Sequence, residues 1–325
     1  MKNMKILYGI NGTGNGHITK SLNIISNLKK LGYKDIDILI SGDNYSLDVP
    51  FKYKFHGFSL KYSQYGSIDY IKTVESFKPI QFLKDCNLDI SKYNKIITDF
   101  EPITAWACKK QKVSCLGISH QYSFLSDKSP RPNKINFLGE FILNNMAPVD
   151  NQIGLHFKKY DENILYPIIR DDILYSHPIK GRIYIVYLPS YSLEQLLSIL
   201  SKHKAVFEIF TKEVNGIRTY KNCLIKPNSI KDFTKSFINC KGIITSAGFE
   251  TPAEAMYMKK KLMCIPILGQ YEQLCNAESL KELGVMVKED LSEIDEFLYK
   301  RSSYNFKWED PMTEIINRII HYLPK

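Results

Sequence analysis

Residues 5–20 read KILYGINGTGNGHITK, an apolar run that passes through a glycine-rich turn into a helical pattern. The run predicts a buried strand, and Gly12, Gly14 and Gly16 let the backbone turn tightly and approach a ligand. Free N–H groups at the start of the following helix attract an anion. The stretch therefore predicts the strand–turn–helix opening of a doubly wound α/β domain, with a negative or oxyanionic group docked at the turn.

The turn differs from two familiar nucleotide-binding motifs. A Walker A loop has a lysine where this chain has Asn15, which excludes a P-loop. A dinucleotide fingerprint reads G-x-G-x-x-G, whereas this turn reads G-x-G-x-G-H, and Asp37 lies inside the second predicted strand instead of at its end. We therefore expect neither a nicotinamide nor a flavin cofactor.

Short apolar runs alternate with helix-length segments along the whole chain, as in βαβ units with a mostly parallel sheet. The predicted strands are residues 5–10, 35–40, 95–98 and 113–119, then 182–188, 206–211, 224–226, 242–245 and 262–266. The predicted helices are residues 17–31, 104–110, 193–200, 251–258, 274–283 and 312–323. The same architecture occurs twice. We expect an α/β protein of two facing Rossmann-like doubly wound domains, with ligands bound in the interdomain cleft.

A break in periodicity separates the two halves. Residues 160–182 contain Pro167, Pro178 and Gly181, and a length of 325 residues suits two domains of about 150 residues each. We expect an N-terminal domain at residues 1–165 and a C-terminal domain at residues 166–325. The terminal helix is expected to pack back on the first domain.

Composition bounds the class of protein. The hydrophobic share of 44% excludes a disordered chain, and seven cysteines without a C-x-x-C pair argue against zinc or disulfide frameworks. No apolar run approaches the ~20 residues that span a bilayer, and the chain start has no signal-peptide pattern. We expect a cytoplasmic protein. The net charge of +10 favours anionic partners, although the scattered lysines form no single basic arm.

The candidate catalytic pair is His17 with Asp99. His17 ends the glycine turn, and Asp99 follows the strand at residues 95–98, which parallel topology brings to the same rim. An imidazole with a carboxylate partner can act as a general base. The alternatives are a histidine that caps its own helix and acids, Asp99 and Glu101, that cap the next helix. His120 reaches the same rim as a weaker candidate.

The most specific segment reads IITSAGFETPAEAM, residues 243–256, and is followed by LMCIPILGQYEQLCNA, residues 262–277. A strand, a small-residue turn at Ser246-Ala247-Gly248 and a helix with Pro252 in its first turn predict a second anion-binding helix start. A diphosphate suits this turn. Glu254 lies one helical turn further on, where it can accept hydrogen bonds from a ribose diol, and Glu272-Gln273 occupy the next strand-to-helix turn. Each alone could be ordinary capping.

These segments resemble the GT-B glycosyltransferases, in particular the branch with the lipid II-forming UDP-N-acetylglucosamine transferase, the UDP-glucuronosyl and plant glucosyltransferases, and similar bacterial and archaeal proteins. The resemblance implies that Asp99 partners the catalytic His17 and that Glu254 holds the ribose. It further implies that Glu272 and Gln273, with Asn276 beyond, contact the donor sugar, and that residues at Asn228 read a base, uracil in this branch.

The chain departs from the family pattern at two places. Phe249-Glu250 replaces Trp-Asn, and the glycine-rich turn expected at the start of the second domain is Leu188-Pro189-Ser190-Tyr191-Ser192. The hydroxyl of Ser190 remains a candidate phosphate ligand, and Arg170 is either a phosphate ligand or, by default, half of a surface ion pair. No D-x-D metal-binding pattern occurs near the donor segment.

The resemblance implies an inverting, metal-independent glycosyltransferase that moves a sugar from a UDP-sugar to an acceptor hydroxyl, without a further cofactor. Two alternatives remain open: a UDP-sugar 2-epimerase on the same fold, and a basic nucleic-acid-binding or regulatory module, which lacks a visible recognition motif. The acceptor is an unidentified glycan, lipid or small molecule. Residues 51–55 and 62–66 are candidates for an acceptor groove or for peripheral contact with an anionic inner membrane face, although alternation favours an ordinary strand at 51–55.

Overall fold

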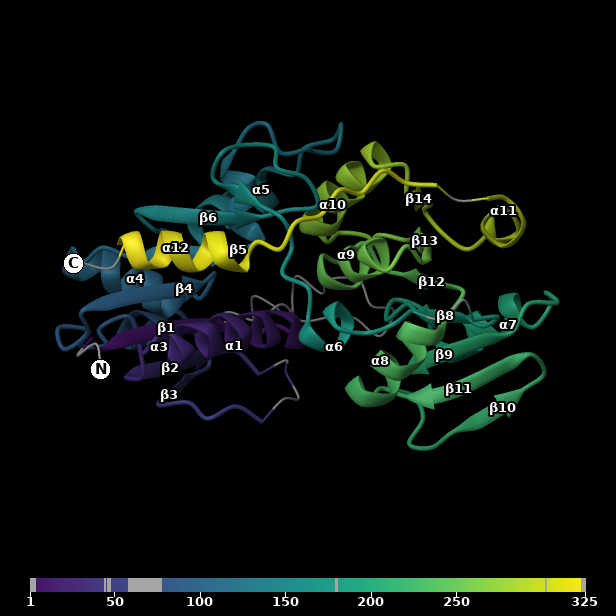
Figure 1. The fold of residues 1–325 in the computed structure, drawn as a ribbon, viewed down its shortest axis with the longest axis horizontal. Helices are drawn as coiled ribbons and strands as arrows, with labels where there is room; N and C mark the ends of the chain where they lie inside the picture. Colours follow the sequence, from purple (N-terminus) through teal and green to yellow (C-terminus); the bar gives the residue numbers. More distant parts are fainter. Residues whose placement is uncertain are drawn as a thin grey trace.

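The structure is a computed structural model that describes residues 4–43, 45, 48–57, 78–178, 181–301 and 303–322. It contains two lobes, each built around one twisted sheet (Figure 1). The segment at residues 62–66 lies outside the described residues. Within the described part of the chain, no helix is both long and apolar enough to cross a membrane.

The first lobe holds a sheet of seven strands, among the described residues, in the order β3-β2-β1-β4-β5-β6-β7. Its strands are β1 (Ile6–Asn11), β2 (Ile36–Ser41), β3 (Tyr53–Phe55), β4 (Lys95–Asp99), β5 (Leu116–Ser119), β6 (Asn151–Leu155) and β7 (Ile164–Leu165). All of these strands pair in parallel. The helices are α1 (Asn15–Lys30), α3 (Pro79–Asp85), α4 (Pro102–Gln111), the 3₁₀ helix η1 (Gln121–Leu125) and α5 (Phe137–Asn145).

The second lobe repeats the plan with the strand order β10-β11-β9-β8-β12-β13-β14. Its strands are β8 (Tyr184–Tyr187), β9 (Phe207–Thr211), β10 (Arg218–Tyr220), β11 (Cys223–Pro227), β12 (Gly242–Thr245), β13 (Lys261–Cys264) and β14 (Met286–Val287). Only β10, at the edge, runs antiparallel to its neighbour among the described strands. The helices are α6 (Asp171–Leu174), α7 (Leu193–Leu200), α8 (Ile230–Asn239), α9 (Glu250–Tyr257), α10 (Tyr271–Glu282) and α11 (Ile294–Tyr299).

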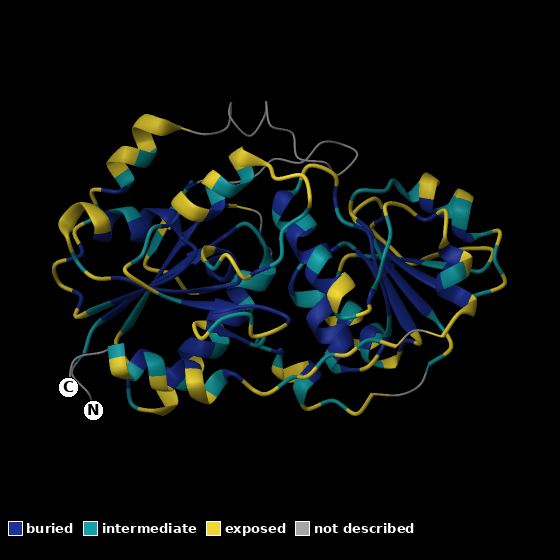
Figure 2. Ribbon diagram, turned by 90° about the horizontal axis from the view of Figure 1, so that it is seen from above, coloured by how far each residue is buried: buried dark blue, intermediate teal, exposed yellow. Residues whose placement is uncertain are grey.

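The strands are buried on both faces because helices cover each sheet on both sides (Figure 2). Ile6, Tyr8 and Ile10 on β1 are wholly buried, as are Ile243 and Ile244 on β12. Near-continuous apolar runs of this kind are typical of parallel sheets inside α/β layers. The apolar core is continuous between the lobes. The two lobes therefore form one packed body.

The last helix, α12 (Met312–Tyr322), leaves the second lobe and packs beside α1 of the first (Figure 1). Ile315 and Ile319 on its inner face are wholly buried. At its end the Tyr322 hydroxyl donates to Ser114 Oγ at 3.0 Å. The last described helix thus packs on the first lobe.

Each sheet has one point where the direction of winding reverses, between β1 and β4 in the first lobe and between β8 and β12 in the second. Ligands of doubly wound sheets bind outside the carboxyl ends of the strands at this point. Ile10 of β1 pairs with Asp99 of β4, and Tyr187 of β8 pairs with Thr245 of β12. The glycine turn and the segment 246–248 therefore both begin at the winding reversals.

Candidate active site in the interdomain cleft

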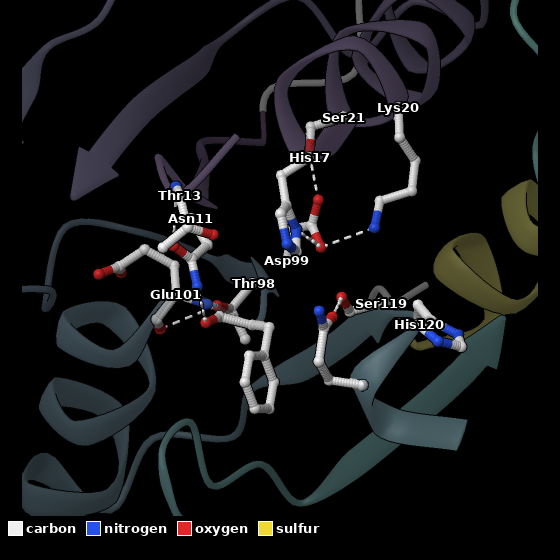
Figure 3. Close-up of polar contacts among 12 residues, drawn as sticks. Asn11, Thr13, His17, Lys20, Ser21, Thr98, Asp99, Glu101, Ser119 and His120 are labelled. Carbon is white, nitrogen blue, oxygen red and sulfur yellow. Dashed lines mark hydrogen bonds and ion pairs between the residues drawn. The ribbon is translucent and has the colours of Figure 1, made fainter. Parts of the chain in front are cut away.

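The structure brings His17 and Asp99 together. Nδ1 of His17 lies 2.9 Å from Oδ1 of Asp99, although 82 residues separate them in the chain (Figure 3). The contact follows from topology, because the turn after β1 and the end of β4 meet at the same rim. His17 lies in the first turn of α1 and is partly exposed, whereas Asp99 is wholly buried.

Two further side chains of α1 hold the Asp99 carboxylate. Lys20 Nζ lies 2.8 Å from Oδ1, the oxygen that also receives His17, and Ser21 Oγ donates to Oδ2 at 2.9 Å (Figure 3). Burial by itself raises the pKa of Asp99, but the charge of Lys20 and the contact with His17 outweigh it and hold that pKa well below its usual range. Asp99 is therefore an ionised carboxylate throughout the physiological range.

The end of β4 is shaped by its neighbours. Phe100 has φ of 53°, a left-handed conformation that is uncommon for a bulky residue, and Asn11 Nδ2 donates to its carbonyl oxygen at 3.1 Å. Glu101 is the N-cap of α4: its carboxylate accepts from Ile103 N at 2.8 Å and Thr104 N at 2.7 Å. Capping is therefore the role of Glu101, which leaves Asp99 free to face α1.

The three glycines of the turn have different surroundings. A Cβ on Gly12 would lie 2.8 Å from the carbonyl oxygens of Ser41 and Gly42, so this glycine permits close packing on β2. A Cβ on Gly14 would have no neighbour within 4 Å. A Cβ on Gly16 would lie 2.6 Å from Cδ of Glu250, a residue of the second lobe. The start of α1, where the sequence predicts a bound anion, is thus approached by the carboxylate of Glu250.

The predicted donor turn lies opposite. Ser246, Ala247 and Gly248 follow β12, and α9 begins directly after them at Glu250. Ala247 is wholly buried, whereas Ser246 and Gly248 are partly exposed, and a Cβ on Gly248 would meet only Ser246 Oγ, at 3.9 Å. The Cα of Gly248 is therefore not tightly packed against neighbouring side chains.

Two further predicted donor residues lie at the carboxyl ends of neighbouring strands. Ser190 follows β8 and is partly exposed. Asn228 follows β11 and is exposed, with its backbone N–H donating to Thr211 O at 3.2 Å. The adjacent Ser229 caps α8 by accepting from Asp232 N at 3.3 Å. Both positions stay accessible at the edge of the second sheet where the donor is predicted.

Glu254 forms an ion pair that the sequence did not predict. Arg170 donates from Nε to Oε1 at 2.6 Å and from Nη2 to Oε2 at 2.7 Å, and its Nη1 donates to Thr234 Oγ1 at 3.2 Å. The Glu254 side chain is only 3% exposed. Arg170 therefore forms an ion pair, as its default expectation holds, but the pair is largely buried instead of lying on the surface, and it links the interdomain segment to α9.

Glu272 and Gln273, the adjacent pair expected to contact the donor sugar, have different surroundings. Glu272 is partly exposed and accepts from Gln121 Nε2 of the first lobe at 3.0 Å; burial raises its pKa, against the opposing effects of Gln121, His17 and Lys20. Gln273 is buried and accepts from Ile267 N at 3.0 Å, which fixes the loop before α10. Of this pair, Glu272 is the residue that faces the cleft.

His120 and Asn276 join the lobes. Nε2 of His120 lies 2.7 Å from Oδ1 of Asn276, whose Nδ2 donates to Ala247 O at 3.1 Å. The imidazole also stacks on Phe249 with centroids 3.9 Å apart. Burial lowers the pKa of His120 to about 4, against the hydrogen bonds to Leu155 and Asn276. His120 therefore connects the first lobe, through Asn276, to the turn at residues 246–248.

Sequence reasoning missed Lys20, Ser21 and Gln121. Lys20 and Ser21 stand three and four residues after His17, the spacing that places side chains on one face of a helix. That spacing was a usable signal once His17 and Asp99 had been paired. Gln121 carries no such signal, because its partner Glu272 lies 151 residues away.

A cavity of about 110 Å³ lies between the lobes, beside this cluster. Its polar side is formed by Asn11, Thr13, Gln121 and Glu272, and its apolar side by residues of α5 and its flank, Leu138, Ile142, Leu143 and Met146. The cavity is mainly apolar. A molecule with one polar end and an apolar body fits this lining.

The comparisons with known proteins agree with this geometry. Residues 4–301 match the family described as Glycosyl transferase family 1. No curated protein matches the sequence. The two seven-stranded sheets with their helices, one in each lobe, are those of the GT-B fold.

Several solved structures share the fold at low sequence identity. Spinosyn forosaminyltransferase SpnP is 12% identical, with 99% of this chain and 96% of that chain covered and a TM-score of 0.54. Arabidopsis thaliana UGT89C1 complexed with UDP-L-rhamnose is 12% identical, with coverage of 88% and 85% and a TM-score of 0.55. A UDP-N-acetylglucosamine 2-epimerase is 12% identical, with coverage of 99% and 97% and a TM-score of 0.57. With two Rossmann-like lobes and a family match over most of its length, the chain belongs to glycosyl transferase family 1 and is a glycosyltransferase.

Proposed function

We propose that the protein transfers a sugar from a UDP-sugar to an acceptor hydroxyl, with inversion at the anomeric carbon and without a metal ion. The observation that carries this proposal is the contact of 2.9 Å between His17 Nδ1 and the buried carboxylate of Asp99, at the rim that faces the donor turn. A UDP-sugar is supported by UGT89C1, whose structure was solved with UDP-L-rhamnose.

His17 is the proposed general base. Because Nδ1 faces Asp99, Nε2 is the nitrogen left to accept the proton of the acceptor hydroxyl. The acceptor oxygen forms a bond to the anomeric carbon as the bond from that carbon to the β-phosphate oxygen breaks, and UDP departs with the electron pair. Asp99 stabilises the imidazolium that results.

The leaving diphosphate is proposed to bind at Ser246, Ala247 and Gly248. Backbone N–H groups at the start of α9 are oriented before charge develops, so they stabilise the diphosphate without a metal ion. Ser190 is proposed to add a hydroxyl contact, and Asn228 to read the uracil with backbone groups. The acidic first residue of α9, Glu250, has to be accommodated beside that diphosphate.

The donor's ribose and sugar are proposed to lie along α9 and α10. Glu254 accepts from the ribose diol while Arg170 fixes its carboxylate at 2.6 and 2.7 Å. Glu272 contacts the sugar hydroxyls directly. Gln273 and Asn276 are proposed to shape this site, since the first fixes the preceding loop and the second holds Ala247.

The acceptor is proposed to enter the apolar cavity beside α5, with its hydroxyl toward Thr13 and His17. We place this acceptor side in residues 1–165 and the donor side in residues 166–325. Gly12, Gly14 and Gly16 form the turn on which the acceptor's polar end rests. The exposed apolar residues Ile135, Phe137 and Phe141 around α5 make an acceptor with an apolar body the preferred class.

A screen of nucleotide sugars tests the proposal. Binding to the native state raises the melting temperature, so UDP and UDP-sugars are expected to stabilise the protein more than ADP- or GDP-sugars at equal concentration. Release of UDP in the presence of lipophilic alcohols, measured for wild type and His17→Ala, then tests the chemistry. Stabilisation only by purine nucleotides would contradict the donor assignment.

A second candidate function is UDP-sugar 2-epimerisation, which is favoured by the likeness to the UDP-N-acetylglucosamine 2-epimerase over 99% of this chain. Epimerisation needs no acceptor. Incubation with UDP-N-acetylglucosamine alone separates the two functions, because an epimerase converts the sugar whereas a transferase leaves it unchanged.

A further inference from the structure

A buried ammonium group lies directly behind the proposed catalytic pair. Lys20 has a side chain only 5% exposed, and its Nζ lies 2.8 Å from Oδ1 of Asp99. The same oxygen lies 2.9 Å from Nδ1 of His17 (Figure 3). Burial of a lysine is costly unless it is paired, so its position is fixed by Asp99.

The charges in this cluster make Lys20 more than a packing residue. Asp99 is wholly buried and ionised, and its other oxygen, among the residues that the structure describes, receives the neutral hydroxyl of Ser21 and no charged group. A buried carboxylate requires a positive partner. If Lys20 were absent, the imidazolium of His17 would be the nearest group able to provide that charge. An imidazole that is already protonated cannot accept a proton from an acceptor hydroxyl.

We propose that Lys20 is a positioning residue that supplies the counter-charge of Asp99, so that His17 rests as a neutral imidazole with its base capacity free. This inference rests on the proposed role of His17 as general base. Lys20 contacts Asp99 and acts through it. Before the reaction the cluster then holds the negative charge of Asp99 and the positive charge of Lys20. After proton transfer it also holds the positive charge of the His17 imidazolium.

Other ionisable groups face this cluster from each neighbouring element. Glu272 of α10 interacts with both His17 and Lys20, and Glu250 of α9 lies against Gly16. His120, after β5, is neutral because burial lowers its pKa to about 4. Tyr8 of β1 and Tyr122 of η1 stay protonated, because burial raises the pKa of both hydroxyls. Lys20 is thus the permanent positive charge in contact with Asp99 among the described residues.

The test compares three single variants of the full chain. Lys20→Met removes the charge, Lys20→Arg keeps it, and Ser21→Ala removes a neutral hydrogen bond to the same carboxylate. The readouts are the pH profile of kcat/KM for UDP release and an NMR titration of ¹³C-labelled histidine, with His17→Gln used to assign the His17 signal.

Loss of Lys20 is expected to move the acidic limb of the pH profile upward by about 1–3 pH units, the effect of one close charge. At pH 7 the rate of Lys20→Met falls and recovers at alkaline pH, because the neutral fraction of His17 drops by at most about tenfold for each pH unit by which its midpoint rises. The NMR midpoint of His17 moves upward by the same amount. Lys20→Arg and Ser21→Ala keep the wild-type midpoint.

A rate loss in Lys20→Met that is equal at all pH values, with an unmoved NMR midpoint, would overturn the proposal, because a merely structural lysine behaves in this way. If Lys20→Met fails to fold, Lys20→Gln is used instead, since its amide still donates to Asp99 without a charge. The NMR titration needs no activity. Absence of UDP release by wild type would therefore count against the proposed function, while the midpoint still decides the role of Lys20.

Discussion

Glu250 of the second lobe lies against Gly16 of the first, so close that a Cβ at position 16 would lie 2.6 Å from the carboxyl carbon. Gly16 belongs to the first turn of α1, where free N–H groups favour a negative charge. Glu250 stands where the family pattern has Asn, and this residue makes the contact with Gly16. The contact joins the glycine turn of the first lobe to the first residue of α9 in the second lobe.

A pair of glycine substitutions tests this contact. Gly16→Ala is expected to displace the flexible carboxyl end of Glu250 and to lower the melting temperature slightly, whereas Gly14→Ala is expected to have no such effect because its Cβ meets open space. Thermal unfolding of both variants is the measurement. Gly16→Ala combined with Glu250→Ala should regain most of the loss, and an equal loss in both glycine variants would contradict the contact.

Substitution of His17 separates chemistry from binding. His17→Ala is expected to lower kcat by about 100- to 10,000-fold, the range for loss of a general base, while the Kd for UDP stays within about twofold of wild type. Steady-state UDP release and isothermal titration with UDP provide the two numbers. Asp99→Asn serves as a companion, and a fall in UDP affinity that matches the fall in kcat would argue against the assigned role.

The buried pair of Arg170 and Glu254 predicts a stability effect apart from any ligand. Glu254→Ala leaves the Arg170 guanidinium unpaired and is expected to cost about 3–5 kcal/mol of unfolding free energy. Urea denaturation measures this cost. The double variant Arg170→Met with Glu254→Met is expected to be more stable than Glu254→Ala. Additive losses would show that the pair is not coupled.

Nucleotide binding provides a second test of Glu254. Glu254→Gln keeps the volume of the side chain and is expected to raise the Kd for UDP, since the amide accepts less strongly from the ribose diol. Unchanged UDP affinity in a folded Glu254→Gln variant would remove Glu254 from the donor site.

The pKa of His120 predicts how stability changes with pH. Burial lowers that pKa to about 4, below its ordinary value of 6.5, so the unfolded state binds the proton more readily than the folded state between these values. The contribution is complete above pH 6.5 and is lost as the pH falls through 4, by about 3 kcal/mol. His156, whose pKa burial also lowers, adds to this loss. Denaturation curves at several pH values give the unfolding free energy at each pH. For His120→Gln this free energy is expected to fall less steeply than for wild type as the pH is lowered.

The apolar cavity predicts an acceptor effect with a control on the same helix. Ile142 lines the cavity, whereas Phe141 is 64% exposed and does not. Ile142→Asp is expected to raise the KM for a lipophilic acceptor at least about tenfold, because a carboxylate is costly in an apolar lining. Phe141→Asp should leave that KM unchanged. Equal effects of the two variants would remove the cavity as the acceptor site.

The sequence predicts those parts of the fold that local pattern specifies. Buried parallel strands are near-continuous apolar runs, so β1, β4 and β12 fall within a residue of their predicted bounds. The strand β6 begins with polar residues and contains Gly154, and α5 exposes Phe137 and Phe141 instead of burying them. From sequence alone, therefore, neither β6 nor α5 can be distinguished from a loop.

The same distinction applies to the site. His17 and Asp99 can be paired from sequence because parallel topology determines where strand ends meet. Arg170 and Glu254 stand 84 residues apart on an irregular segment and a helix, and no topological rule relates them. Gln273 and Asn276 match a family motif, yet both amide side chains are occupied by backbone contacts and, for Asn276, by His120.

The position of α12 has a consequence for how the protein is made. Its residues come last in the chain, yet Ile315 and Ile319 complete the apolar covering of α1, in the lobe that is synthesised first. During synthesis the strands of the second lobe leave the ribosome before α12 is available to cover α1. The first lobe can therefore complete its apolar core only after α12 has been synthesised, so the folding of the first lobe depends on a segment that follows the whole second lobe in the chain.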